Sequence, residues 1–324
     1  MFWRVVLLAL GAGVVWKGAT WVVNGSTKMA RFFAFPRIML GFTIIAIGTS
    51  LPELGVGIFS ALGGDTALSL GNIIGAGFLN LCVVLGLAAI ISPVSINRST
   101  LFGEAPFLFL AVGLLWVLGI DGVIDRLDGI LLLVAYCAFF ALIGIQLGTQ
   151  HVHPHILNRI HEFQVTGKTH SVIRTLCMII GGMVALVIGA RLIVDSGIAL
   201  AQWWGVPSLV IGLTLVSLGT VVPEMVTAIV SSRRHANDLN IGNVFGGVVF
   251  NTLCIIGIVG VIYPISIDST LLTRDIPLLL VVSFGVIALL KSGSRLVRWE
   301  GFLLIAVYVL YLVAMLVATP AVHV

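Results

Sequence analysis

The chain has 324 residues, of which 59% are hydrophobic and only 9% are charged, and its mean hydropathy is +1.18. About a quarter of the residues of a typical soluble domain are charged, so this composition excludes a soluble globular protein. The formal net charge of +4 is too small, and too confined to one set of loops, to indicate nucleic-acid binding. We therefore expect an all-α integral membrane protein.

Ten apolar stretches of about 20 residues, the length that crosses a bilayer as a helix, follow one another along the chain. They cover residues 5–23, 38–61, 67–92, 104–120, 128–147, 173–194, 209–231, 238–262, 275–290 and 301–317. A long polar interval separates the first five from the last five. We expect a first five-helix repeat at 1–147, a cytoplasmic linker at 148–171 and a second five-helix repeat at 172–324.

The two halves are copies of each other at one constant offset in sequence, called here the repeat offset. Eight of the ten prolines fall into four pairs at this offset: Pro36 with Pro207, Pro52 with Pro223, Pro93 with Pro264 and Pro106 with Pro277. Such a repeat is the signature of a duplicated fold. Because each copy holds an odd number of spans, the second copy enters the membrane from the opposite side. The sequence thus predicts inverted repeats, the architecture of many secondary transporters.

Lysines and arginines gather in the loops on one side of the predicted spans. Twelve of them lie in the loops after spans one, three, five, seven and nine, and four lie on the opposite side. Cytoplasmic loops carry the excess of positive charge in membrane proteins. We therefore expect a multi-pass protein of the cell membrane with both termini outside the cytoplasm.

One motif, G-T-x-x-P-E, occurs in both halves, at residues 48–53 and 219–224. Its glutamates, Glu53 and Glu224, are the only two of the thirteen acidic residues that we place near the middle of a span. A charge at membrane depth is expensive and by default marks a functional site. The repeat symmetry brings both glutamates to one site near the midplane.

A proline precedes each of these glutamates. Proline removes a backbone donor and clashes with the preceding turn, so we expect the second and seventh helices to be discontinuous at Pro52 and Pro223. The freed carbonyls, around residues 46–49 and 217–220, are then expected to line a cavity. Carboxylates and carbonyls together are hard oxygen ligands, of which Ca2+ takes about six to eight.

A second motif, G-N-x-x-G, lies on the third and eighth spans, at residues 71–75 and 242–246. Its small residues allow close approach of a neighbouring helix. Asn80 and Asn251 follow it, and each can offer a neutral amide oxygen. We expect both asparagines to reach the central site, either directly or through water.

With both motifs present in both halves, the sequence resembles the alpha-repeats of the cation/Ca2+ exchanger superfamily and is most similar to the prokaryotic sodium/calcium exchangers. The likeness covers nearly the whole chain. It implies ten helices in two inverted five-helix repeats, with a first and a sixth helix that slide across the bundle to alternate access. It also implies that two glutamates, here Glu53 and Glu224, bind Ca2+ together with the backbone carbonyls of two threonines, here Thr49 and Thr220.

The resemblance implies a function as well as a fold. The implied function is that of a secondary active antiporter, which exchanges Ca2+ for Na+ by alternating access and is not an enzyme. The transported ions take the place of cofactors, and the expected partners are inorganic cations and the lipid bilayer, with no nucleic acid.

The chain departs from this family where serine hydroxyls are expected as Na+ ligands. Ser50 is retained, whereas the other three places carry no hydroxyl: Val221, Ala76 and Gly247. The remaining candidates for binding a coupling ion are Ser50 and the carbonyls of Ala46 and Ser217. We expect Na+ coupling, with H+ as the alternative, because two close carboxylates in a low-dielectric site favour binding of a proton when no cation is present.

Two other functional classes use the same residues. An intramembrane hydrolase would also need a nucleophile or a histidine-bound metal, and no histidine lies deep in a span. A cation channel could use the same ligands as a selectivity filter, but inverted repeats around one site favour alternating access. The sequence leaves open the physiological cation, the stoichiometry, the direction of transport and the oligomeric state.

Five of the seven histidines lie in the loop between spans five and six, from His151 to His170. Alternating histidines can bind Zn2+ or sense pH. A solvated cytoplasmic linker is the simpler interpretation, because no fixed scaffold holds these side chains in place.

Overall fold

The structure, a computed structural model, describes residues 2–33, 37–63, 66–96, 105–149, 169–204 and 217–318. Seven described helices are long and apolar enough to cross a membrane, and a broken pair, Arg37–Thr49 with Leu51–Phe59, makes an eighth. The expected helical membrane fold is therefore confirmed. The count of ten spans stays a prediction, because α8 (Ala105–Leu118) is short and residues 205–216 lie outside the described ranges. The predicted linker, with its histidines, lies largely outside them too.

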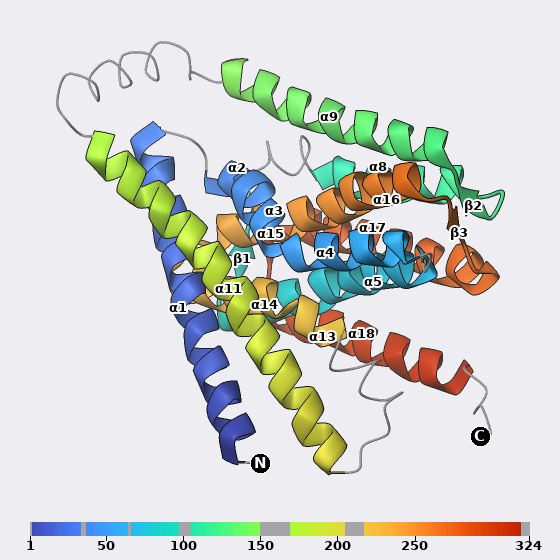
Figure 1. Ribbon diagram of the computed structural model, residues 1–324. Helices are drawn as coiled ribbons and strands as arrows, with labels where there is room; N and C mark the ends of the chain where they lie inside the picture. The colour runs from blue at the N-terminus through green and yellow to red at the C-terminus, as the bar shows by residue number, and fades with distance from the viewer. Residues whose placement is uncertain are drawn as a thin grey trace.

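Figure 1 shows the helices in chain order. The first half contains α1 (Phe2–Phe33), α2 (Arg37–Leu40), η1 (Gly41–Ile45), α3 (Ala46–Thr49), α4 (Leu51–Leu62), α5 (Thr66–Phe78), η2 (Leu79–Val84), α6 (Leu85–Ile91), β1 (Val94–Ser95), α8, β2 (Val123–Ile124) and α9 (Arg126–Thr149). The second half contains α11 (Thr169–Trp203), α13 (Ser217–Thr220), α14 (Val222–Arg233), α15 (Asn237–Val249), η4 (Phe250–Ile255), α16 (Ile256–Ile262), β3 (Ile265–Ser266), η5 (Leu271–Asp275), α17 (Ile276–Gly293), β4 (Arg295–Leu296) and α18 (Arg298–Ala318).

The repeat offset recurs in the element boundaries. It relates α3 to α13, α4 to α14, α5 to α15, η2 to η4 and α6 to α16, at both ends of each element. Even the π-helical turns η2 and η4 follow it, although π-helix is rare and is typically found at functional sites. The duplicated sequence has therefore folded into two copies of the same local structure.

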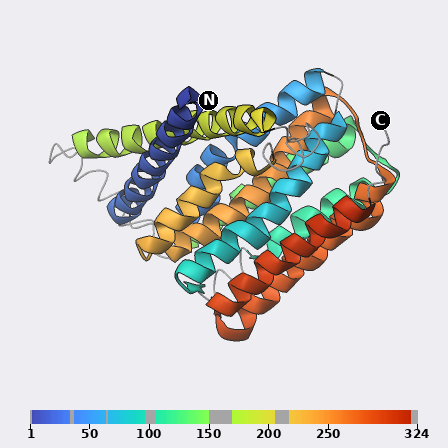
Figure 2. The ribbon, with the colours of Figure 1, turned by 90° about the horizontal axis from the view of Figure 1, so that it is seen from below.

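The helices α1 and α11 are 32 and 35 residues long, longer than the predicted spans 5–23 and 173–194. They lie together on one side of the bundle and run steeply across the direction of α9, α16 and α18 (Figures 1 and 2). At about 1.5 Å per residue each exceeds the roughly 30 Å hydrocarbon layer, so each must tilt or extend beyond it. The predicted ends were wrong because polar residues beyond them continue the helix.

Glycines allow α1 and α11 to pack closely. A Cβ atom added at Gly18 would lie 2.7 Å from the carbonyl oxygen of Gly182, and one added at Gly11 would lie 2.9 Å from that of Gly189. The repeat offset maps Gly11 onto Gly182 and Gly18 onto Gly189. The two contacts are therefore one contact repeated, as expected of two copies related by a two-fold axis.

The spans around α5 and α15 form the centre of the bundle. In the most apolar 18-residue stretch of each of the spans Ser69–Ile91 and Asn237–Ile262, 78% of the residues are buried, against 22 to 33% in the other long spans. Gly242 and Gly246 of α15 pack directly on the backbone of α2 and η1, and a Cβ at Gly246 would lie 2.6 Å from Cα of Phe42. The close approach predicted from the G-N-x-x-G motif is thus confirmed in the second half.

Two short antiparallel ladders join the halves. β1 pairs with β4, and β2 pairs with β3, so each ladder takes one strand from each half. Figure 1 shows β1 at one end of the bundle and β2 with β3 at the other. Equivalent ladders at opposite ends are the arrangement that inverted repeats produce.

Candidate functional site

The second span breaks at Ser50, between α3 and α4, and its two parts are bent by 44°. Pro52 stands in the first turn of α4, where its missing N–H group leaves the carbonyl of Gly48 without its helical donor. The N–H groups of Ser50 and Leu54 still bond to the carbonyls four residues earlier, each over 3.1 Å. The discontinuity predicted from the proline is confirmed.

The second copy breaks at the equivalent place. Val221 separates α13 from α14, and Pro223 lies in the first turn of α14. The N–H group of Val221 donates to the carbonyl oxygen of Leu218 over 3.2 Å, a tighter turn than at Ser50. Both halves therefore present a short helix end and a new helix start at the same point of the motif.

Glu53 and Glu224 lie in the first turns of α4 and α14 and are both fully buried. Among the described residues, none of their four carboxylate oxygens has a hydrogen-bond partner. The two carboxylates are close enough to repel each other electrostatically. The structure thus brings together two glutamates that belong to separate halves of the sequence.

The neighbours of each glutamate come from the other half. Thr220 lies beside the carboxylate of Glu53, and Thr49 and Ser50 lie beside that of Glu224. Thr49 and Ser50 are completely buried. This crossed arrangement makes a single site out of the two motifs.

Asn80 and Asn251 lie in the π-helical turns η2 and η4 and are also buried. Neither amide group has a hydrogen-bond partner among the described residues, and neither does the hydroxyl of Ser50. An unsatisfied buried polar group costs about 1–3 kcal/mol, and native proteins leave few of them. Such a concentration of them indicates a place built for a polar ligand.

Gly247 of α15 lies at the same site. A Cβ atom added there would be 3.7 Å from Oγ of Ser50 and 3.8 Å from Nδ2 of Asn80. Ala76 and Val221, the other two places without the expected hydroxyl, are buried. The missing hydroxyl at Gly247 is therefore a property of the site itself.

Asn243 was not predicted as a site residue, yet it orients one. The Thr49 hydroxyl donates to its amide oxygen over 3.2 Å. The signal that could have found Asn243 was its place in the second copy of the G-N-x-x-G motif.

The Ala46 carbonyl, a candidate ligand for the coupling ion, already accepts hydrogen bonds from the N–H group of Ser50 at 3.1 Å and from the Thr49 hydroxyl at 3.4 Å. Ser217 begins α13, but its side chain lies outside what the structure describes.

The side chains at the site offer mainly oxygen atoms as ligands. Two carboxylates are surrounded by hydroxyl and amide groups, and the described residues contain no group of three or more His, Cys, Asp or Glu side chains that could hold a metal ion. Softer nitrogen and sulfur ligands, which transition metals prefer, are absent from this set. The arrangement suits a hard cation such as Ca2+ or Na+.

The sequence pattern of the sodium/calcium exchanger protein family matches residues 3–144 and 174–317. The chain belongs to this family. Its sequence is 29% identical to that of the inner membrane protein YrbG of Escherichia coli (strain K12), over 99% of both chains. It is 25% identical to the sodium/calcium exchanger MaX1 of Methanosarcina acetivorans, over 96% of this chain and 97% of that one.

Solved structures agree with the sequence relatives. A structure of the sodium-calcium exchanger NCX_Mj soaked with Na+ and Sr2+ superposes with a TM-score of 0.83 at 28% identity, covering 96% of this chain and 97% of that one. The expected resemblance is confirmed. The protein is a multi-pass membrane protein for ion transport by antiport, and it is not an enzyme.

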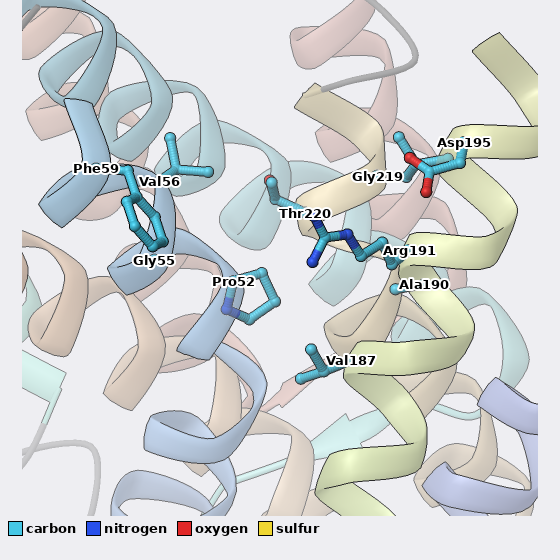
Figure 3. Close-up of a pocket in the computed structure, with 11 residues that line it drawn as sticks. Pro52, Gly55, Val56, Phe59, Val187, Ala190, Arg191, Asp195, Gly219 and Thr220 are labelled. Carbon is cyan, nitrogen blue, oxygen red and sulfur yellow. The ribbon is translucent and has the colours of Figure 1, made fainter. Parts of the chain in front are cut away.

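A pocket of about 490 Å3 reaches the site of this exchanger from the side on which α4 ends (Figure 3). It is lined by Pro52, Gly55, Val56, Phe59, Val187, Ala190, Arg191, Val194, Asp195, Gly219 and Thr220. Two of these residues, Arg191 and Asp195, are charged and lie within α11. Arg191 lies within the predicted span 173–194 but was not predicted as a site residue, and Asp195 was missed because that span was ended one residue before it.

Proposed function

We propose that this exchanger is a secondary active antiporter that moves Ca2+ in exchange for Na+, with Ca2+ held between Glu53 and Glu224. The observation that carries the proposal is the set of four buried carboxylate oxygens, two from each half, without a hydrogen-bond partner among the described residues. A divalent cation neutralises both charges and supplies a partner for all four oxygens.

Further ligands complete the shell. Ca2+ takes about six to eight oxygens, so four carboxylate oxygens leave a few positions for neutral groups. Thr49 and Thr220, at the ends of α3 and α13, offer backbone carbonyls where the helices break. Asn80 and Asn251 offer amide oxygens, either directly or through water.

Alternating access fits the two ends of the bundle. The pocket lined by Pro52 and Thr220 opens on one side of the site, whereas at the other end Arg37 at the start of α2 pairs with Asp238 of α15 over 3.0 Å. In inverted repeats the two halves can exchange conformations, which opens the closed end and closes the open one. The positive-inside rule makes the Arg37 end cytoplasmic and puts both termini outside the cytoplasm.

The coupling ion is proposed to be Na+, in keeping with the family. The alternative, H+, is favoured by one observation: Gly247, with no hydroxyl, lies beside Ser50 and Asn80. Uptake of 45Ca2+ into proteoliposomes, driven either by an outward Na+ gradient or by a pH gradient without sodium, separates the two ions. Uptake driven by the pH gradient alone would overturn Na+ coupling, and flux that needs no counter-ion would indicate a channel.

The shared site is tested with Glu53→Gln and Glu224→Gln in separate proteins. Each should lower 45Ca2+ uptake by more than about tenfold, because each removes one charge and one anionic ligand of the cation. Glu300→Gln is the matched control, since Glu300 is 5% exposed and accepts a bond from the N–H group of Val297 over 2.8 Å, which glutamine can also accept. Normal exchange by either site variant would disprove the shared site.

A further inference from the structure

One face of α11 covers both broken helices. Gly48 in α3 packs against Met183, and Gly219 in α13 packs against Val194. Neither motif glycine has room for a side chain at these contacts. The pocket residues Val187 and Arg191 lie between Met183 and Val194 along α11. This face of the helix is therefore directed toward the central site.

Arg191 places a positive charge on this face, and its side chain is exposed. Within the part of the chain that the structure describes it forms no ion pair, although Asp195 lies one helical turn away and lines the same pocket. Figure 3 shows the Arg191 guanidinium extending across the pocket toward Thr220, the residue beside the carboxylate of Glu53. Guanidinium groups stay charged at all physiological pH values, so the charge acts on the site permanently.

The first half has no arginine at the matching position of its long helix, although Arg234 of α14 reaches that helix and donates to the amide oxygen of Asn24. At the repeat offset Arg191 corresponds to Thr20, which is neutral, and Asp195 corresponds to Asn24. The two otherwise equivalent halves therefore differ in charge along their long helices. In a two-fold site this difference distinguishes the pocket side from the other side.

We propose that the positive charge of Arg191, which is fixed to the protein, weakens Ca2+ binding from the pocket side because it interacts with the negative charges of Glu53 and Glu224 in competition with the ion. The negative charge of Asp195 opposes this effect of Arg191. The inference rests on the proposed function, because it assumes a divalent cation between the two glutamates. A fixed positive charge repels a divalent ion twice as strongly as a monovalent one. Arg191 therefore favours release of Ca2+ over release of Na+ or H+ on this side and acts as a specificity-determining residue.

The test is equilibrium binding of 45Ca2+ to the purified full-length protein, with transport measured in proteoliposomes. Arg191→Gln is expected to lower the half-saturating Ca2+ concentration about fivefold, the order of magnitude that Coulomb's law gives for one charge and a divalent ion separated by ~10 Å of water. The half-saturating concentration of Na+ that displaces Ca2+ at a fixed occupancy should change less. Asp195→Asn should shift Ca2+ binding in the opposite direction.

Charge and structure are separated by two controls. Arg191→Lys keeps the charge and should bind Ca2+ nearly as the unaltered protein does, and the effect of Arg191→Gln should shrink as choline chloride raises the ionic strength. Arg126→Gln removes the same net charge at the start of α9, a helix that does not line the pocket, and should leave binding unchanged.

The binding measurements distinguish failure of this inference from failure of the proposed function. If the unaltered protein binds no Ca2+, both this inference and the proposed function are overturned. If it binds Ca2+ but Arg191→Gln leaves the half-saturating concentration unchanged, or if Arg191→Lys behaves like Arg191→Gln, only the role of Arg191 is overturned.

Discussion

The hydroxyl of Thr49 donates a hydrogen bond to the amide oxygen of Asn243 over 3.2 Å, and this bond connects the two halves of the chain at the central site. Thr49 belongs to the G-T-x-x-P-E motif of the first half, and Asn243 belongs to the G-N-x-x-G motif of the second. Asn243 follows Gly242, at which α15 packs on the backbone of α2 and η1. The close packing of the second motif therefore fixes the orientation of a residue in the first.

Removing this bond should weaken Ca2+ binding. Asn243→Ala takes away the shorter-range of the two acceptors of the Thr49 hydroxyl and leaves the Ala46 carbonyl at 3.4 Å. A buried hydrogen bond contributes about 1 kcal/mol, so we expect a rise of up to about fivefold in the half-saturating Ca2+ concentration for 45Ca2+ uptake. Thr49→Val should have a similar effect, and Thr49→Ser, which keeps a hydroxyl, a smaller one.

A double-mutant cycle checks that the bond itself is responsible. If Thr49 and Asn243 act through each other, the double variant should be little worse than either single variant. Fully additive effects would mean that the two residues contribute independently and that the bond has no role in cation binding.

The site has room for the hydroxyl that Gly247 lacks. A Cβ atom there would make ordinary contacts, at 3.7 Å and 3.8 Å, with Ser50 and Asn80. Gly247→Ser adds an oxygen ligand and should lower the half-saturating Na+ concentration in exchange assays several-fold, since Na+ is a hard cation that binds oxygen. Gly247→Ala, which fills the same space without a hydroxyl, is the control, and equal effects of the two variants would rule out a ligand role.

Much of this site could be predicted from the sequence because the chain contains its own comparison. The constant repeat offset identifies Glu53 and Glu224 together, and proline chemistry predicts the breaks beside them. What the sequence could not give depends on how distant segments pack. The neighbourhood of Gly247 is visible only once α15 lies against Ser50 and η2. Arg191 is found beside the site only once α11 packs across α3 and α13.

The crossing of α1 and α11 should be intolerant of side chains at its repeated glycine contacts. A Cβ atom at Gly182 would lie 2.8 Å from the carbonyl oxygen of Gly18, whereas one at the adjacent Gly181 would meet nothing within 4 Å. Gly182→Ala should therefore destabilise the protein by about 1–3 kcal/mol, the usual cost of overpacking, and lower its melting temperature in detergent by several degrees.

Gly181→Ala is the matched control, one residue away on the same helix. Because alanine is the better helix former by about 1 kcal/mol, this variant should melt at the same temperature or slightly higher. A fall in melting temperature as large as that of Gly182→Ala would show that any substitution in this turn is harmful, and the contact with Gly18 would then have no special part.

The ion pair of Arg37 with Asp238 should govern access more than stability. Its side chains are 38% and 34% exposed, and pairs of this kind contribute about 0–1 kcal/mol, so Asp238→Asn should leave the melting temperature nearly unchanged. The pair lies at the end of the bundle opposite the Arg191 pocket and lines a second pocket of about 530 Å3, to which the buried side chain of Ile96 also contributes. We expect Asp238→Asn to raise the rate at which a polar thiol reagent labels Ile96→Cys by about two- to fivefold, the range that corresponds to about 1 kcal/mol or less. Raising the salt concentration should increase labelling in the protein with Asp238 intact, because salt screens exposed pairs, and should have little effect once Asp238 is replaced. Equal labelling with and without Asp238 would mean that the packing of α2 on α15 alone keeps this end closed.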